Sequence, residues 1–373
     1  MKKYVCIIIA SLLIVGLFVM SGFGNSNTEV EVENPEYYAE MLKKLKGTTL
    51  NVFNWGEYIS DGSEGALDVI GAFEKLTGIA VNYTTFDSNE AMYGKMQSES
   101  VGYDIIIPSD YMIDRMRSEN RLKEIDFSKI PNYKYIDDKY KNAYYDPENK
   151  FTVPYSVGMV GLIYNETVVK ETPGSWGIMW DEKYKDNILT FNNPRDAFAI
   201  AQFYLGIDIN SEDKADWDKA AAKLREQNKV LQGRVMDEVF DKMEGGNAAI
   251  APYYAGDYLT MADVNPDLKF VYPKEGTNIF VDAICIPSSS QNYEAALLFI
   301  NFLLDPNVAV ANANYICYAS PNTAVLEHPD YDLAGNEYLY PENQDEIKTE
   351  YFHNLDPKTI KYFEELWQAI KIE

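Results

Sequence analysis

Two short segments end in side chains that could enclose an organic cation. In Asn51–Tyr58 and in Asp104–Tyr111, a largely apolar stretch leads directly into aromatic, acidic and hydroxyl residues. An indole, phenols and carboxylates gathered at one place suit a cation, because ring faces attract positive charge and carboxylates pair with it. Either segment alone also fits an ordinary strand followed by a loop with exposed aromatics.

The same kind of cluster recurs along the chain, with an acid beside aromatic or turn residues. The five clusters are Trp55-Gly56-Glu57-Tyr58, Ser109-Asp110-Tyr111, Pro194-Arg195-Asp196, Tyr254-Ala255-Gly256-Asp257 and Phe280-Val281-Asp282. An aliphatic diammonium ligand needs ring faces along its methylenes and carboxylates at its charged ends, since a buried ammonium is costly unless it is paired. Five clusters at strand ends or helix starts favour such a ligand more strongly than any one cluster.

Catalysis is a weaker interpretation of the same acids. Asp196, Asp257 and Asp282 could act in acid–base chemistry, but nothing in the sequence places two of them at a catalytic separation. The chain has no glycine-rich phosphate loop and no nucleophile elbow. We therefore expect a binding protein without a cofactor, and turnover of a bound amine would be the sign of an enzyme.

Metal binding leaves one alternative open. The only histidines, His328 and His353, are not paired at ligand spacing, and no Cys/His pattern indicates zinc. The adjacent Tyr253 and Tyr254 could ligate ferric iron through phenolates, although packing is the commoner role of such a pair. Ferric iron or a different amine remains the alternative ligand.

The N-terminus predicts export. Lys2 and Lys3 precede an apolar run from Val5 to Met20 and the small-residue exit Ser21–Gly24, which is typical of an export signal. The run is long enough for an uncleaved anchor, so residues 1–24 are predicted to be either a signal or an anchor. We expect the mature protein outside the cytoplasm.

The net charge of the chain restricts the kinds of partner that it can bind. The formal net charge is −25, so nucleic acid is a poor partner, whereas a cationic ligand is favoured.

Beyond the signal only Cys285 and Cys317 remain. A single bridge between them is one alternative, and two buried free thiols are the preferred one.

The elements that must position these clusters alternate between strand and helix. Residues 25–46 are acidic and polar and are predicted to be a tether ending in a short helix. Alternation at this spacing favours a mostly parallel α/β sheet, in which ligands lie outside the carboxyl ends of the strands. The predicted strands are 49–54, 79–83, 103–108, 187–190, 248–251 and 279–287, and the predicted helices include 67–77, 89–97, an amphipathic 293–304 and 362–372.

The chain also resembles the spermidine/putrescine-binding proteins of bacterial polyamine ABC importers. This resemblance covers the chain from about Leu50 to its C-terminal helix. The resemblance rests on whole strings of residues. They are Asn54-Trp55-Gly56-Glu57-Tyr58, Ser88-Asn89-Glu90-Ala91-Met92-Tyr93, Val153-Pro154-Tyr155, Pro273-Lys274-Glu275-Gly276, Ile300-Asn301-Phe302-Leu303-Leu304 and Tyr318-Ala319-Ser320-Pro321-Asn322.

The resemblance implies a two-lobed, periplasmic-binding-protein-like α/β fold of type II, with hinge crossovers between the lobes. Lobe 1 would comprise residues 47–157 plus 280–326, and lobe 2 would comprise residues 158–279 plus 327–373. Ser156-Val157-Gly158 would be one hinge, and the ligand would bind between lobes that close by hinge motion. The implied partners are a polyamine and the membrane permease of an ABC transporter, and the protein is expected to be a monomer.

The resemblance also implies which residues bind the ligand. They are Trp55, Glu57, Tyr58, Ser109, Tyr111, Asp196, Tyr254, Asp257, Phe280, Asp282, Tyr318 and His353. The sequence departs from the family pattern at three of its positions: Asn193 stands where spermidine-type members often carry an acid, and Tyr254 and Phe280 replace tryptophans. Asp257 matches the putrescine-type pattern, so the choice between putrescine and spermidine stays open.

Overall fold

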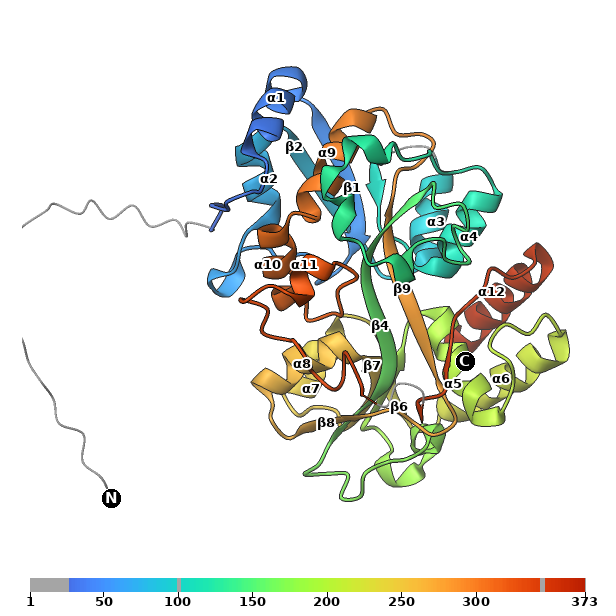
Figure 1. Ribbon diagram of the computed structural model, residues 1–373. Helices are drawn as coiled ribbons and strands as arrows, with labels where there is room; N and C mark the ends of the chain where they lie inside the picture. The colour runs from blue at the N-terminus through green and yellow to red at the C-terminus, as the bar shows by residue number, and fades with distance from the viewer. Residues whose placement is uncertain (1–26, 99–101, 343–345, 373) are drawn as a thin grey trace, which may run out of the picture.

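The computed structural model describes residues 27–98, 102–342 and 346–372 (Figure 1). The predicted export signal at residues 1–24 lies outside these ranges. Within them, no single helix is long and apolar enough to cross a membrane. One bent pair, Tyr293–Leu303 with Pro306–Ile316, passes the same test together, although its two halves meet at 74°.

The strands form two halves of one mixed sheet, which is the centre of a two-lobed α/β fold. The strand order is β2-β1-β3-β9-β4-β7-β5-β6, with β10 beside β9 and β8 beside β4. The strands are β1 Thr49–Trp55, β2 Ala80–Phe86, β3 Ile105–Ile106, β4 Thr152–Asn165, β5 Ile188–Phe191, β6 Leu231–Val235, β7 Ile250–Tyr254, β8 Leu268–Val271, β9 Thr277–Cys285 and β10 Thr349–Glu350.

Helices cover both halves of the sheet. In Figure 1 the upper lobe contains β1 and β2 with α1, α2, α3, α4 and α9, and the lower lobe contains β6 and β7 with α5, α6, α7 and α8. The helices are α1 Pro35–Leu45, α2 Val69–Thr77, α3 Asn89–Gln97, α4 Asp110–Ser118, α5 Pro194–Leu205, α6 Lys214–Gln227, α7 Glu238–Glu244, α8 Ala255–Val264, α9 Tyr293–Leu303, α10 Pro306–Ile316, α11 Thr323–Leu326 and α12 Pro357–Ile372.

Two long strands join the lobes. β4 and β9 run antiparallel from one lobe into the other (Figure 1), and Ser156, Val157 and Gly158 pair with Asp282, Val281 and Phe280 respectively. The register of this pair shifts between Pro154 and Ser156. The residues predicted to form a hinge therefore lie directly opposite two of the predicted ligand-binding residues.

Local signals explain why several helices begin and end where the sequence predicts. The Asp68 side chain accepts a hydrogen bond from the Gly71 amide at 2.8 Å and begins α2, and Gly78 ends it in the left-handed conformation at φ 67°. Ser88 caps α3 in the same way, accepting from the Ala91 amide at 3.1 Å. The boundaries of α3 match the predicted ones.

One expectation about these elements holds only in part and another is wrong. The sheet is mixed: five of the described strand pairs are parallel, as expected, but the two strands that join the lobes pair antiparallel with each other and with β3, β7 and β8. The helix predicted to be amphipathic, α9, is buried at every residue from Ala295 to Leu303. Helices α1 and α10 and the segment before β4 cover the sides that an amphipathic helix would expose.

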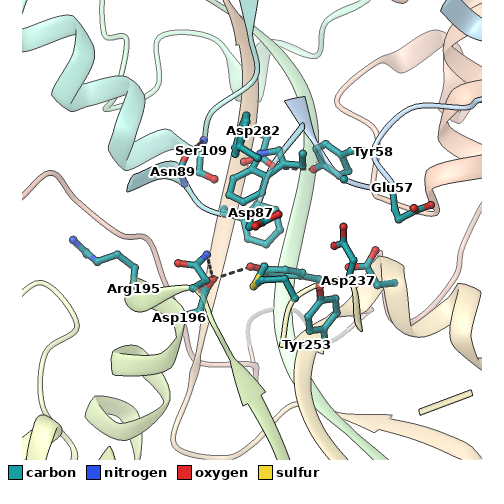
Figure 2. A pocket seen from close by; sticks show the side chains of 18 of the residues that line it. Glu57, Tyr58, Asp87, Asn89, Ser109, Arg195, Asp196, Asp237, Tyr253 and Asp282 are labelled. Carbon is teal, nitrogen blue, oxygen red and sulfur yellow. Dashed lines mark hydrogen bonds between the residues drawn. The ribbon is translucent and has the colours of Figure 1, made fainter. Parts of the chain in front are cut away.

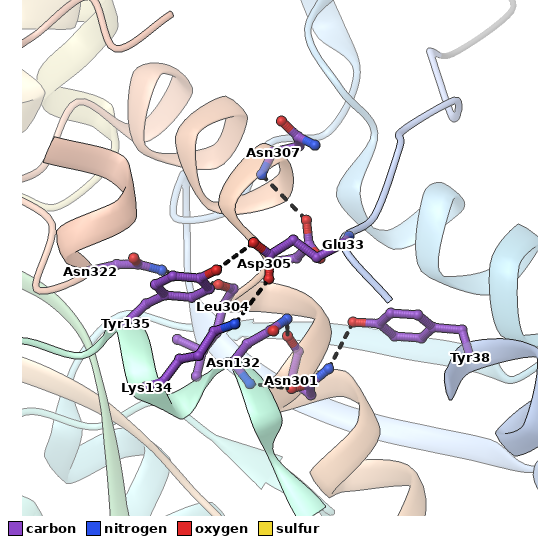
Figure 3. Close-up of polar contacts among 10 residues, drawn as sticks. All are labelled: Glu33, Tyr38, Asn132, Lys134, Tyr135, Asn301, Leu304, Asp305, Asn307 and Asn322. Carbon is purple, nitrogen blue, oxygen red and sulfur yellow. Dashed lines mark hydrogen bonds and ion pairs between the residues drawn. The ribbon is translucent and has the colours of Figure 1, made fainter. Parts of the chain in front are cut away.

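The segment predicted to be a tether is packed on the upper lobe. It does end in a short helix, α1, but Tyr38 of that helix is fully buried against Phe302. Figure 3 shows how polar contacts hold the segment: the Glu33 amide donates to Asp305 at 2.9 Å, and the Asn301 side chain donates to the Tyr38 hydroxyl at 2.9 Å. Residues 27–46 are therefore part of the folded body.

Both cysteines of the described residues, Cys285 and Cys317, are free thiols. Cys285 is buried and Cys317 is partly exposed, so the alternative of a bridge between them is wrong, as is the expectation that both are buried. Burial raises the pKa of the Cys285 thiol well above its usual range, which keeps it protonated and unreactive.

Candidate functional site

A cavity lies between the two lobes and takes its lining from both. It encloses about 690 Å³ of empty space, including the part that opens to solvent. Ten of its residues are labelled in Figure 2. The lining residues predicted from the sequence are Trp55, Glu57, Tyr58, Ser109, Tyr111, Asp196, Tyr254, Asp257, Phe280, Asp282 and Tyr318.

The carboxylate of Asp282 has one oxygen free to accept a ligand. Asp282 lies on β9 and is only 3% exposed. Its Oδ2 accepts a hydrogen bond from the Tyr58 hydroxyl at 2.7 Å, and its buried Oδ1 has no partner. Because the Tyr58 proton is used in this way, the Ser156 hydroxyl must donate in its own contact with Tyr58. The hinge strand thereby orients the carboxylate.

Aromatic rings surround this carboxylate. Tyr58 and Tyr318 pack edge to face with ring centroids 5.0 Å apart, and Phe280 lies 5.4 Å from Tyr254 in the same geometry. The ring of Phe280 rests on Gly158, where a Cβ atom would come within 2.4 Å of the ring. Glycine in the hinge strand therefore makes room for one wall of the cavity.

The lower lobe contributes two further carboxylates. Asp196 stands in the first turn of α5 and accepts hydrogen bonds from the Tyr254 hydroxyl at 2.8 Å and from the Asn193 amide at 2.7 Å. Asp257 stands in the first turn of α8 and accepts from the Tyr318 hydroxyl at 3.0 Å. The other polar atom of Asn193, its Oδ1, is buried without a partner.

Burial dominates the electrostatics of these three acids. Removal from water raises the pKa of Asp282 to about 6, of Asp196 to about 7 and of Asp257 to about 8, and hydrogen bonds from Ser109 and from tyrosine hydroxyls oppose the rise only in part. At pH 7 and without a ligand, Asp257 therefore holds its proton for most of the time, Asp196 is about half protonated and Asp282 is mostly ionised. A bound cation would reverse the balance, because an opposite charge favours the ionised form.

Ser109 and Tyr111 line the cavity from the start of α4. The Tyr111 hydroxyl donates to Glu90 at 2.9 Å, and the Ser109 amide donates to Asn89 at 3.1 Å. Between them, the fully buried Asp110 accepts a hydrogen bond from the Val281 amide at 3.1 Å. That contact ties α4 to the stretch of β9 that carries Phe280 and Asp282.

His353 does not line the cavity, so its predicted place in the site is wrong. Its side chain is exposed, and its ring lies 4.6 Å from that of Tyr144. The segment between β10 and α12 has no regular structure, so no helical or strand period predicts which of its side chains face the cavity. Phe352, one residue earlier, is buried and lines the cavity instead.

Sequence reasoning missed a group of lining residues near Glu57. Asp87, Asp237, Phe86 and Met236 belong to it. Phe86 ends β2 and Met236 follows β6 directly, so the rule that ligands lie beyond strand ends could have found all four. Two further lining residues were singled out from the sequence in other ways, Asn193 as a departure from the family pattern and Tyr253 in the iron alternative. The remaining lining residues, which were not predicted, are Gly56, Asn89, Arg195, Phe240, Asn278 and Phe352.

The group near Glu57 brings negative charge from both lobes to one end of the cavity. Asp237 lies so close to Gly56 that a Cβ there would be 2.2 Å from its carboxylate. Burial and the charges of Glu57 and Asp87 raise the pKa of Asp237 to about 6. This end of the cavity thus also favours a positive charge.

The tyrosine pair proposed for ferric iron is poorly placed for that role. The Tyr254 hydroxyl donates its proton to Asp196, and Tyr253 packs with its ring 5.3 Å from that of Phe191. Burial raises the pKa of both phenols well above their usual range. Both effects oppose the phenolate form that iron requires. Among the described residues, no group of three or more His, Cys, Asp or Glu side chains is arranged to hold a metal ion.

Comparisons with known proteins find relatives over most of the chain. Residues 102–337 match the model of the family described as bacterial extracellular solute-binding protein. A spermidine/putrescine-binding periplasmic protein of Salmonella typhimurium (strain LT2) is 32% identical over 325 residues, covering 87% of this chain and 91% of the relative. A putrescine-binding periplasmic protein of Escherichia coli (strain K12) is 30% identical, with the same coverage of both chains.

Solved structures give the same result. A putative spermidine/putrescine ABC transporter protein from Listeria monocytogenes superposes with a TM-score of 0.82 at 35% sequence identity, covering 87% of this chain and 99% of that one. A substrate-binding protein of a spermidine/putrescine ABC transporter from Streptococcus pneumoniae superposes with a TM-score of 0.70 at 34% identity. It covers 87% of this chain and 99% of its own.

Proposed function

This chain belongs to the family of bacterial extracellular solute-binding proteins, and we propose that it captures a polyamine, putrescine or spermidine, for an ABC importer. The family is one of transport proteins and is not a class of enzymes. The observation that carries the proposal is the cavity itself, in which ring faces and carboxylates of both lobes converge on one space.

The unpartnered atoms of the cavity fit the chemistry of an ammonium group. Asp282 Oδ1 and Asn193 Oδ1 are buried acceptors without a donor, and leaving such atoms unpaired is costly. An ammonium supplies three donors and no acceptor. One end of the polyamine would bind at Asp282, the other at Asp196 or Asp257, and the methylenes would lie along the rings of Trp55, Tyr58, Tyr111, Tyr254, Phe280 and Tyr318.

Release to a permease requires the cavity to open. Residues 47–157 plus 280–326 and residues 158–279 plus 327–373 are the lobes that we propose to move, with Ser156-Val157-Gly158 as one hinge. Captured ligand would then be presented to the permease subunits in the membrane by a monomeric receptor. The periplasmic location of the relatives supports a location outside the cytoplasm, and residues 1–24 would serve as the export signal or anchor.

Calorimetric titration of the purified protein tests the proposed function. Putrescine and spermidine should bind with a stoichiometry of one, and both should compete for the same site. Spermine and Fe(III) are the comparison ligands for the alternatives. Binding of Fe(III) with no response to any polyamine would contradict the proposal.

Trp55 gives a first prediction about the role of the rings. Its indole nitrogen donates to the Ile107 carbonyl at 2.9 Å, and its ring lies 4.5 Å from that of Phe86. Cation–π contacts contribute about 0.5–2 kcal/mol, so Trp55→Leu should weaken binding by about threefold or more. Trp55→Phe should keep much of the affinity. Equal dissociation constants for the two variants would show that the ring only packs.

Asn193 gives a second prediction, about ligand length. It is 3% exposed, lines the cavity and donates to Asp196. Asn193→Asp would place a second carboxyl beside Asp196, and the extra amine of spermidine could pair with it through a charge-assisted hydrogen bond. We expect the preference to shift toward spermidine, measured as the ratio of the two dissociation constants. An unchanged ratio would mean that cavity length, and not the number of charges, selects the ligand.

A further inference from the structure

Arg195 is a cation buried in a cavity that is otherwise built for cations. It is the second residue of α5, is only 2% exposed and lines the cavity. Figure 2 shows its side chain extending away from Asp196 at one end of the site. A guanidinium there cannot attract a polyamine, so its presence needs another explanation.

The guanidinium lies against aromatic rings of both lobes. Its Cζ atom is 4.5 Å from the ring centroid of Phe352 and 5.0 Å from that of Tyr111. Phe352 lies in the segment that leads to α12, whereas Tyr111 belongs to α4 of the upper lobe. The side chain of Arg195 therefore spans the division between the lobes.

No described carboxylate forms an ion pair with Arg195. Its hydrogen bonds are long, 3.4 Å to the His353 carbonyl and 3.3 Å to Asn210 Oδ1. A buried charge without a counterion is costly, and here the ring faces supply the compensation. Burial lowers the pKa of the guanidinium, and the neighbouring Tyr111 and Glu90 oppose that change.

The upper lobe places a complementary charge at the same contact. Glu90 accepts the hydrogen bond of the Tyr111 hydroxyl, and its other oxygen is buried without a partner. Tyr111 thus connects a carboxyl of the upper lobe to a guanidinium of the lower lobe. Moving the lobes apart would leave both groups without this compensation.

We propose that Arg195 is a positioning residue that stabilises the closed cleft through a cation–π contact with Tyr111 across the lobes. The inference rests on the proposed function, because Tyr111 is also one of the rings that would contact the polyamine. Arg195 acts on closure and not on the ligand. Its contribution should therefore be the same for every polyamine that the closed cleft accepts.

The test compares Arg195→Met with a matched variant, Arg234→Met. The guanidinium carbon of Arg234 lies 5.2 Å from the Trp367 ring, with both residues in the lower lobe. Arg195→Met should raise the dissociation constants of putrescine and spermidine five- to twentyfold by the same factor. The increase should come from faster dissociation in stopped-flow measurements. Arg234→Met should leave both constants within twofold of the wild type.

Each other result overturns the inference. Tighter binding by Arg195→Met would mean that the guanidinium only repels the ligand. If the dissociation constants of putrescine and spermidine rise by different factors, Arg195 contacts the ligand directly. Dissociation constants equal to those of the wild type would show that Arg195 does not contribute to closure of the cleft. If Arg195→Met does not fold, Arg195→Lys decides, because it keeps the charge but loses the planar guanidinium and should show a smaller loss in the same direction. A wild type that binds neither polyamine would instead contradict the proposed function.

Discussion

Replacing Asp282 with alanine should weaken polyamine binding at least tenfold, which is the largest effect that we expect from one substitution. The carboxylate is buried and offers an unpartnered oxygen to the cavity. Truncating one partner of a buried, hydrogen-bonded charge pair typically costs about 2–5 kcal/mol, and tenfold in affinity corresponds to about 1.4 kcal/mol. Calorimetry with putrescine measures the change directly.

Two control variants separate this role from packing and from net charge. Asp282→Asn keeps the shape and a partner for Tyr58 but removes the charge, so it should lose nearly as much affinity as alanine. Asp267→Asn removes one negative charge from an exposed loop before β8 and should leave binding unchanged. Normal affinity in Asp282→Ala would exclude this residue as the anchor.

Strand–helix alternation predicted the α/β class and the clusters at the strand ends, and the resemblance supplied the two lobes and the full set of binding residues. Trp55, Tyr254 and Asp282 were predicted because each belongs to a strand or directly follows one, and the three meet in one cavity. The alternation of strands and helices does not predict the direction of the two strands that join the lobes. β4 and β9 are buried along nearly their whole length, and such strands show no period that distinguishes parallel from antiparallel pairing.

The errors in the site have a similar physical origin. His353 was placed by resemblance in a stretch without regular structure, where no helical or strand period predicts which side chains face the cavity, and Phe352 occupies the cavity instead. Asp237 was missed because the loop after β6 carries no aromatic residue next to its acid. Asp237 lies close to Glu57 because of the way the two lobes pack together, and a local sequence pattern does not predict that packing.

Polyamine affinity should fall steeply as the pH is lowered from 8 to 6. The ammonium groups of the ligand stay protonated throughout this range, since alkylammonium groups such as lysine have pKa values near ~10.4. The carboxyls that would pair with them do not stay ionised, because burial raises the pKa of Asp282 to about 6, of Asp196 to about 7 and of Asp257 to about 8. Below each value the carboxyl is neutral and cannot pair.

The size of this effect follows from the number of protons displaced. A carboxyl that must ionise on binding weakens the affinity about tenfold for each pH unit below its pKa, or ~1.4 kcal/mol. We therefore expect the dissociation constant of putrescine to rise at least about tenfold between pH 8 and pH 6. Near pH 7 binding should release protons, seen as a calorimetric heat that changes with the ionisation enthalpy of the buffer.

The same pKa values fix the sign of the effect on stability. In the unfolded chain an aspartate has a pKa of about 3.9, so between pH 4 and pH 8 the folded, ligand-free protein holds more protons than the unfolded chain. Its stability should therefore decrease as the pH rises through this range. A bound polyamine offsets that loss by pairing with the ionised carboxylates. The increase in melting temperature on adding putrescine should thus be larger at pH 8 than at pH 5.5.

Asp196→Asn provides the decisive comparison for this pH dependence. The variant lacks one of the titrating carboxyls, so its affinity should be lower at pH 8 but should change less between pH 8 and pH 6. Neither His328 nor His353 lines the cavity. A dissociation constant that is flat from pH 8 to pH 6 in the wild type would mean that the buried carboxyls are already ionised without ligand. In that case the hydrogen bonds that Asp282, Asp196 and Asp257 accept from Ser109 and the tyrosine hydroxyls would outweigh the cost of burial.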